Sequence, residues 1–166
     1  MVRPIVRIPD PVLRQRAMPV ERPLDPEIQA LIADMKDSCS AAEGIGLAAP
    51  QLGVSKRVII INYPQGSPYG LINPELVWKS SGTTLLEEGC LSIPDIVVGV
   101  TRPKKVKVRA LNEQGQSIEI TADDLLAKIL QHEIDHLNGV LITDHGQSSP
   151  KKPKSAPAEE NRLVNA

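Results

Sequence analysis

Residues 131–136 constrain this chain most strongly, because they read QHEIDH inside an amphipathic pattern. Histidines four residues apart lie one above the other on an α-helix, so His132 and His136 can reach one metal ion. Glu133 points close to the same space and can carry a proton for a water at that metal. The pattern predicts a helix and indicates a metal-dependent hydrolase. The alternative is that both histidines are ordinary polar positions on a helix surface.

The predicted helix should be buried on its metal side. One face carries two aliphatic and two metal-ligand positions, Leu125, Ile129, His132 and His136. Thr121 with Asp124 resembles a capping box and predicts the start of the helix, and residues 138–139 (Asn-Gly) predict its end. Lys128 lies near the metal face, and we expect its side chain to extend outward to solvent.

A catalytic site of this kind needs a third protein ligand and an open position for water. Cys90, in the segment EGCLS, is a candidate because a thiolate binds soft or borderline divalent metals. Downstream of His136 the chain offers Asp144 and His145, but the spacing to His145 does not fit HExxHxxGxxH. The alternative for Cys90 is a buried small hydrophobic residue, as free cysteines usually are.

A third segment, GIGLAAPQ at residues 44–51, precedes EGCLS and QHEIDH along the chain. Together the three segments resemble the signature motifs of the peptide deformylases, GxGxAAxQ, EGCxS and QHExDH, in the same order and without a substitution at the fixed positions. The resemblance extends over residues 3 to 145. It implies an enzyme of N-terminal methionine processing, which hydrolyses the formyl group of N-formylmethionyl nascent peptides and releases formate.

The resemblance also implies a role for the motif residues. The implied metal ligands are Cys90, His132 and His136. Glu133 would move the proton, while the Gln51 side-chain amide and the Leu91 backbone N–H would stabilise the oxyanion. Taken singly, Gln51 could instead cap a turn and Glu133 could be a solvated helix residue.

We further expect the motif segments to bind the substrate peptide. Gly44 and Gly46 would let an extended peptide lie against the backbone, and Ile45 would line the pocket for the methionine side chain. Leu125 and Ile129 are suitable walls for the same thioether side chain.

The ligand types alone do not identify the metal. One sulfur and two imidazoles favour zinc on chemical grounds. The resemblance implies Fe(II), one ion per chain, with Zn(II), Ni(II) or Co(II) able to substitute.

Length and charge exclude several other classes. A chain of 166 residues is long enough for one domain with a core. The net charge of −1 gives no strong electrostatic attraction to DNA or membranes. No apolar run approaches a membrane span, and the start does not read as a signal peptide. With two cysteines, one of them a thiolate ligand, a disulfide framework is not supported, so we expect a cytoplasmic protein.

These segments predict an α+β fold, a single compact domain in which antiparallel or mixed β-sheets pack around a central metal-binding helix carrying HExxH. A helix should begin at Asp25-Pro26 and end before Gly44. The candidate strands are residues 57–62, 71–72, 75–78, 83–86, 97–101, 106–111 and 117–121. Residues 1–146 would form the catalytic domain. Residues 147–166, rich in Pro, Lys and Ser, would form a flexible tail that could contact the ribosome transiently.

Two rival functions remain open at this point. A metallo-amidase or peptidase could act on another N-acyl group, such as acetyl, if there is room for an extra methyl beside the oxyanion donors. A ribosome-associated binding protein could keep the metal only for structure, although a structural site has no use for the base Glu133.

Overall fold

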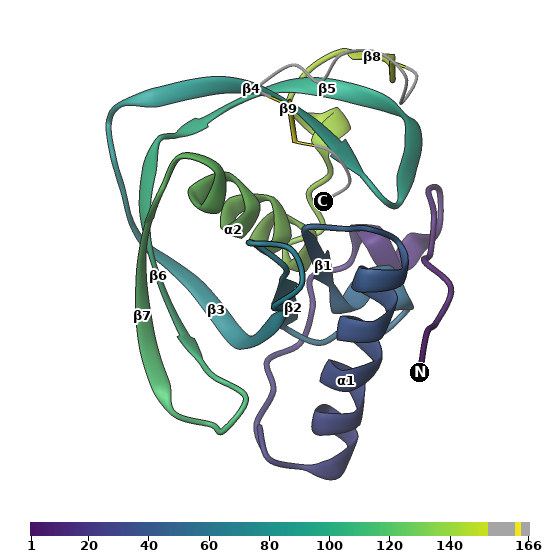
Figure 1. Cartoon of the computed structure of the whole chain (residues 1–166), viewed down its shortest axis with the longest axis vertical. Helices are drawn as coiled ribbons and strands as arrows, with labels where there is room; N and C mark the ends of the chain where they lie inside the picture. Colours follow the sequence, from purple (N-terminus) through teal and green to yellow (C-terminus); the bar gives the residue numbers. More distant parts are fainter. Residues whose placement is uncertain (153–161, 164–166) are drawn as a thin grey trace.

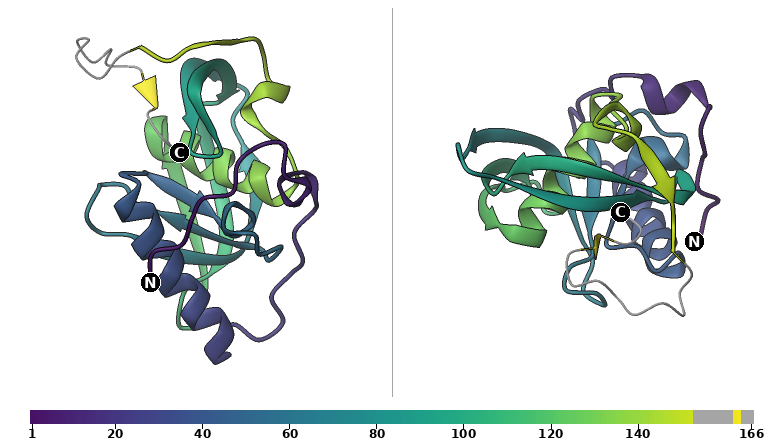
Figure 2. Two further views of the ribbon diagram at one scale, coloured as in Figure 1. Left: turned by 90° about the vertical axis from the view of Figure 1, so that its right-hand side faces the viewer. Right: turned by 90° about the horizontal axis from the view of Figure 1, so that it is seen from above.

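Two β-sheets and two α-helices form the computed structural model of the chain, which describes residues 1–152 and 162–163 (Figure 1). The helices are α1 (Pro26–Ala41) and α2 (Asp124–Leu137). Three short 3-10 helices are η1 (Pro11–Arg14), η2 (Ala49–Leu52) and η3 (Ile142–Asp144). The segment before α1 runs over the outside of the molecule (Figure 2). The arrangement is a compact α+β fold, as the sequence predicted.

The larger sheet has five strands that all pair antiparallel, in the order β1-β2-β3-β6-β7. Its strands are β1 (Gly46–Ala48), β2 (Val58–Ile61), β3 (Tyr69–Lys79), β6 (Lys105–Leu111) and β7 (Ser117–Asp123). The strand β6 alternates exposed and buried positions, as expected for a sheet with one face against the core. By contrast, β2 is buried at all four positions, so both of its faces are covered.

The smaller sheet has the order β8-β5-β4-β9. Its strands are β8 (Ser148–Pro150), β5 (Ile93–Pro103), β4 (Thr83–Cys90) and β9 (Arg162–Leu163). The long β4–β5 hairpin is antiparallel, β8 pairs antiparallel with β5, and β9 pairs parallel with β4. Because β4 ends at Cys90, this sheet brings the thiol to the side of α2.

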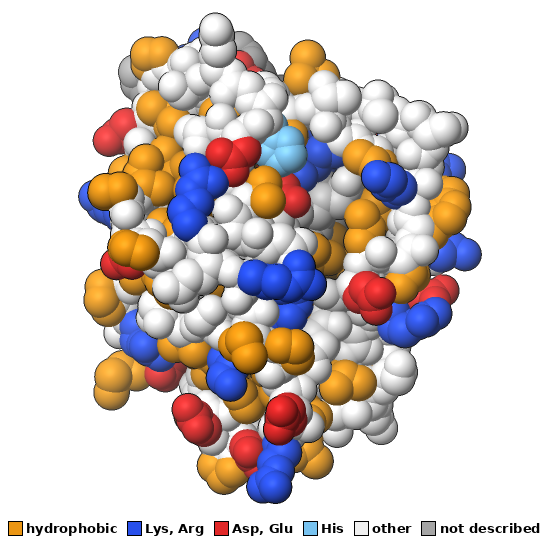
Figure 3. All heavy atoms as spheres, turned by 180° about the vertical axis from the view of Figure 1, so that it is seen from behind, with side chains coloured by type: hydrophobic (Ala, Val, Ile, Leu, Met, Phe, Trp, Pro, Cys, Tyr) orange, Lys and Arg blue, Asp and Glu red, His pale blue; other side chains and the backbone are white. Residues whose placement is uncertain are grey.

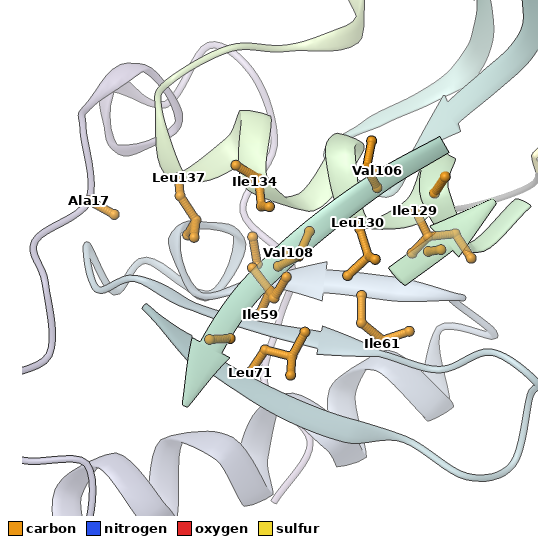
Figure 4. Packing of buried hydrophobic residues seen from close by; sticks show 14 residues of the cluster. Ala17, Ile59, Ile61, Leu71, Val106, Val108, Ile129, Leu130, Ile134 and Leu137 are labelled. Carbon is orange, nitrogen blue, oxygen red and sulfur yellow. The ribbon is translucent and has the colours of Figure 1, made fainter. Parts of the chain in front are cut away.

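The helix α2 packs between the sheets, and aliphatic side chains hold it there. Ile59 and Ile61 of β2 belong to the same buried cluster as Leu130 of α2 (Figure 4). The alternate residues Val58 and Ile60 pack with α1 in a second cluster. The period of two along β2 therefore fixes both helices on opposite faces of one strand. Each such side chain contributes roughly 1.5–3 kcal/mol when fully buried.

Several details differ from the sequence prediction. Lys128 is fully buried instead of reaching solvent, and its ammonium donates to the carbonyl oxygens of Thr84 (2.7 Å) and Val100 (3.2 Å). The predicted capping box at Thr121 is wrong, because β7 continues to Asp123, which is the N-cap residue of α2 and makes no capping hydrogen bond with its side chain. The two strand carbonyls satisfy a buried ammonium that would otherwise have to reach water.

The C-terminal segment also differs in part from the expectation. We expected no regular structure from residue 147 onward, but residues 148–150 pair with β5 and residues 162–163 with β4. The predicted tail residues 153–161 and 164–166, including Lys154, lie outside the described residues. Among the described helices, none is both long and apolar enough to cross a bilayer.

Candidate metal centre

The ends of β4 and α2 bring three candidate ligands together. Cys90 closes β4, and His132 and His136 lie one turn apart on α2. One ligand atom from each residue lies within 4.8 Å of the others, and the Cys90 Sγ is 3.4 Å from the His136 Nε2. All three residues are buried. Cys90, which precedes the two histidines by 42 and 46 residues in the sequence, thus converges with them on one point.

Buried atoms without partners occur on both histidines and on the neighbouring Glu133. Among the described residues, the buried side-chain atoms that lack a hydrogen bond are His132 Nε2, His136 Nδ1 and both carboxyl oxygens of Glu133. Leaving such polar atoms unpaired away from water costs free energy, so a cluster of them indicates an ion or water. One sulfur and two imidazoles form a donor set that divalent zinc or iron accepts. The residues present therefore fit a divalent cation.

The ring of His132 is oriented by Glu88, a residue to which we assigned no role from the sequence. His132 Nδ1 lies 2.8 Å from Glu88 Oε1, so that its N–H donates to the carboxylate and Nε2 is left to face the ligand cluster. Burial raises the pKa of Glu88, but hydrogen bonds from Arg102 and His132 outweigh it and hold the pKa at about 2. Glu88 therefore stays negative beside the metal-ligand ring.

Arg102 completes this support with two hydrogen bonds to Glu88, of 2.7 Å from Nε and 2.9 Å from Nη2. Its remaining Nη1 donates to Asp135 at 2.8 Å, and Asp135 in turn contacts His145 Nε2 at 2.9 Å. A hydrogen-bonded chain thus runs from the metal-ligand ring to the partly exposed His145. Glu88 precedes Cys90 by two, a spacing that shares one face in a regular strand, but the pairing of β4 with β5 shifts register between these two residues. Nothing local in the sequence links Arg102 to Glu88.

The pKa values of the two histidine rings shift in opposite directions. Burial lowers the pKa of His136 well below its ordinary value, which favours the neutral ring that can coordinate a metal. Burial also acts to lower the pKa of His132, but hydrogen bonds with Cys90 and Glu88 raise it above the ordinary value. A cation entering the centre would therefore displace a proton from His132.

Glu133 lies fully buried beside the ligands. Burial raises its pKa to about 7, against the lowering effect of the charge on His132. A carboxyl group with such a pKa can both accept and release a proton near neutral pH. Gly46 makes room for it, because a Cβ on that glycine would lie 2.5 Å from Glu133 Oε1. The alternative of a solvated helix residue is wrong for Glu133.

Two hydrogen bonds hold the side-chain amide of Gln51 beside Cys90. Its Oε1 accepts from the Ala48 N–H at 2.9 Å, so the side chain does cap the η2 turn. Its Nε2 donates to Ser92 Oγ at 3.1 Å and lies 3.7 Å from Cys90 Sγ. Leu91, the predicted backbone donor, follows Cys90 and is half-buried. The donor end of Gln51 is therefore aimed at the ligand cluster.

Three of the residues expected to bind the substrate share one apolar cluster. Ile129 is fully buried, and Ile45 and Leu125 pack partly buried against the same cluster. The carbonyl oxygen of Gly44 accepts from Asn62 Nδ2 at 2.8 Å, which fixes the backbone just before β1. Leu125 and Ile129 are on α2 together with two of the metal ligands, and their contact with a methionine side chain stays a prediction.

A buried thiol and two imidazoles converging beside a carboxyl group of raised pKa define the kind of centre that metal-dependent hydrolases use. The family model of the polypeptide deformylases matches residues 2–152. The chain therefore belongs to the peptide deformylase family, hydrolases that remove the N-formyl group from nascent peptides. The resemblance drawn from the three motifs is confirmed.

Individual relatives agree with this assignment. The peptide deformylase of Bartonella henselae is 47% identical over 148 residues, covering 87% of this chain and 84% of the relative. A crystal structure of a peptide deformylase from Legionella pneumophila superposes with a TM-score of 0.84 at 45% identity, covering 89% of this chain and 87% of that one. The Met-Ala-Ser-bound enzyme from Acinetobacter baumannii has a TM-score of 0.82 at 36% identity, covering 87% and 98%.

Proposed function

We propose that this chain releases formate from N-formylmethionyl peptides at a divalent metal held by Cys90, His132 and His136. The observation that carries the proposal is the convergence of these three buried ligand atoms within 4.8 Å in a chain of the deformylase family. The unpaired Nε2 of His132 supports the same ligand set. We propose Fe(II) as the working ion, one per chain, with Zn(II), Ni(II) or Co(II) able to substitute, because the motif resemblance implies it.

A divalent ion in this position would supply Lewis acidity, which acidifies water and polarises a carbonyl group. The chain's own residues would do the rest. Glu133 would take the proton of the attacking water and pass it to the departing amine, a shuttle for which its pKa of about 7 is suited. Because Glu133 is buried and its oxygens have no hydrogen-bond partner among the described residues, neither transfer competes with a structural hydrogen bond.

Charge on the formyl oxygen would be stabilised by two donors. Gln51 Nε2 already points to Cys90, and the Leu91 N–H belongs to the next residue along the chain. In the complex, Gln51 would exchange its contact with Ser92 for one with the substrate oxygen. Removing one such donor typically costs on the order of 10²–10³ in rate.

The substrate would lie extended against the backbone of Gly44 and Gly46, with its methionine side chain against Ile45, Leu125 and Ile129. The Met-Ala-Ser complex of the Acinetobacter relative supports a peptide that begins with methionine. The thiolate ligand needs reducing surroundings, which supports the cytoplasm as the location.

We retain the proposed division into a catalytic domain at residues 1–146 and a tail at residues 147–166. The family match, which reaches residue 152, supports placing the catalytic domain in the N-terminal part. Transient contact of the basic tail with the ribosome remains part of the proposal, since Lys151 and Lys152 could meet RNA phosphates.

The test is formate release from formyl-Met-Ala-Ser by an anaerobic, iron-loaded sample, compared with acetate release from the acetyl analogue. We expect formate and no acetate, because the chain belongs to a family that removes formyl groups. Glu133→Gln should keep the metal and lose formate release, while Glu119→Gln on the surface of β7 should retain it. Equal cleavage of the acetyl peptide would favour an amidase of other specificity. Metal binding without any hydrolysis would favour a structural metal.

A further inference from the structure

A cavity of about 590 Å³ lies against the face of α2 that does not carry the metal ligands. Gln131, Ile134 and Asp135 line it, at helix positions rotated away from those of His132 and His136. The remaining walls come from the segment before α1, the residue before β2, the middle of β3, Arg102 of β5 and Asn138 after α2. Its volume is within the range of pockets that bind small molecules. No step of the proposed hydrolysis uses this cavity.

Two arginines line the cavity without a carboxylate partner. Among the ion pairs of the described part of the chain, none involves Arg16 or Arg57. Arg57 donates instead to two groups at the end of α2, the Leu137 carbonyl (3.0 Å) and Asn138 Oδ1 (3.1 Å). Burial lowers the pKa of Arg57, and the nearby charge of Arg16 lowers it further. The fold therefore holds two like charges close together at one opening.

The acidic groups around the cavity do not cancel these charges. Asp135 already contacts both Arg102 and His145. The positive charge of Arg102 is compensated by Asp135 and Glu88. Glu75 remains, an exposed residue just past the middle of β3. Two guanidinium groups thus face one carboxylate, so the opening favours an anion.

We propose that this cavity binds a small molecule through a phosphate or carboxylate group held between Arg16 and Arg57. The planar guanidinium fork matches both kinds of oxyanion and can bind them with paired hydrogen bonds. Leu76 and Ile134 supply apolar wall for the body of such a ligand. The face of the molecule that carries the segment before α1 is the one in Figure 3, where Lys and Arg side chains lie among acidic and uncharged ones.

The experiment is a calorimetric titration of the metal-loaded protein at low salt, with inorganic phosphate and with acetate in separate runs. Arg16→Gln removes one guanidinium that is exposed and makes no ion pair within residues 1–152, so folding should be unaffected. Arg14→Gln is the matched control, because it removes the same charge two residues away, where the arginine pairs with Asp144 outside the cavity. Deformylation of formyl-Met-Ala-Ser by each variant reports whether the metal centre is intact.

We expect saturable binding of at least one anion by the wild type, weakened about tenfold or more by Arg16→Gln and unchanged by Arg14→Gln. The anion that binds identifies the ligand group as phosphate or carboxylate. Absence of saturable binding overturns the proposal. Equal weakening by both variants overturns it too, since it would mean a diffuse effect of charge. Binding insensitive to both variants would place the anion elsewhere, for instance at the metal, and would also overturn it.

Discussion

Replacing Glu88 by glutamine tests how far the metal centre depends on the carboxylate behind His132. In the structure this fully buried carboxylate accepts three hydrogen bonds, one from His132 and two from Arg102. A glutamine keeps the shape but has only one accepting oxygen, and its NH₂ group would face a donor. At least one of the three donors must then lose its partner.

The magnitude follows from the burial of the charges. The side chain of Arg102 is only 5% exposed, so its charge would remain buried with Asp135 as the one anionic partner. Removing one partner of a buried pair costs about 3–5 kcal/mol, and we expect about 3 kcal/mol because Asp135 stays. Loss of the carboxylate that orients a metal-ligating histidine costs about 10–100-fold in metal affinity or activity.

Two assays separate these effects. Urea denaturation of the metal-free protein measures the loss of stability, and competition with a chelator measures metal affinity. Glu119→Gln is the control, since it removes a carboxylate from an exposed pair with Arg109 at 3.6 Å. The reasoning is refuted if Glu88→Gln unfolds at the same urea concentration as Glu119→Gln and holds metal as tightly as the wild type.

Three further predictions rest on single contacts. Gly46→Ala should lower kcat about 10²-fold with metal content unchanged, because its Cβ would displace the Glu133 carboxyl; Gly82→Ala, which meets nothing within 4 Å, is the control in the same formate assay. Lys128→Met should destabilise the fold by about 1–2 kcal/mol, because the loss of the donor to two strand carbonyls outweighs the gain from removing a buried charge. An unchanged midpoint of urea denaturation would contradict this. Ending the chain after Lys152 keeps β8 and the family match, so formyl-peptide hydrolysis should persist, and its collapse would give the tail a catalytic role.

Local patterns predicted most of the elements. The helix beginning at Pro26 and the end of α2 before Asn138 follow from residues whose backbone preferences act locally. Most strands were predicted in the right places but with other bounds: β4 continues to Cys90, β3 was predicted as two strands, and β2 is shorter than the predicted residues 57–62. The short strands β1, β8 and β9 were not predicted. The segment from Glu87 to Cys90 has few residues of high β-propensity, so its own sequence does not predict a strand. Pairing with β5 extends β4 through this segment.

Contacts between distant segments could not be predicted in this way. The capping signal at Thr121 lost to pairing of β7 with β6, which carries that strand to Asp123. Lys128 was expected in solvent because a lysine is rarely buried, yet carbonyls of β4 and β5 receive its ammonium. Likewise, the motifs predicted the metal ligands. The hydrogen bond from Arg102 to Glu88 could not be predicted in this way, because the two residues are 14 positions apart in the sequence.

X-ray absorption at the edge of the bound metal tests the ligand set, on which the whole account depends, most directly. For the metal-loaded wild type we predict one sulfur at about 2.3 Å together with two imidazole nitrogens per ion. The sulfur contribution should disappear in Cys90→Ser, while Cys39→Ser, which changes the buried thiol of α1, should leave the spectrum unchanged. A wild-type spectrum with no sulfur neighbour, or one altered only by Cys39→Ser, would contradict the account.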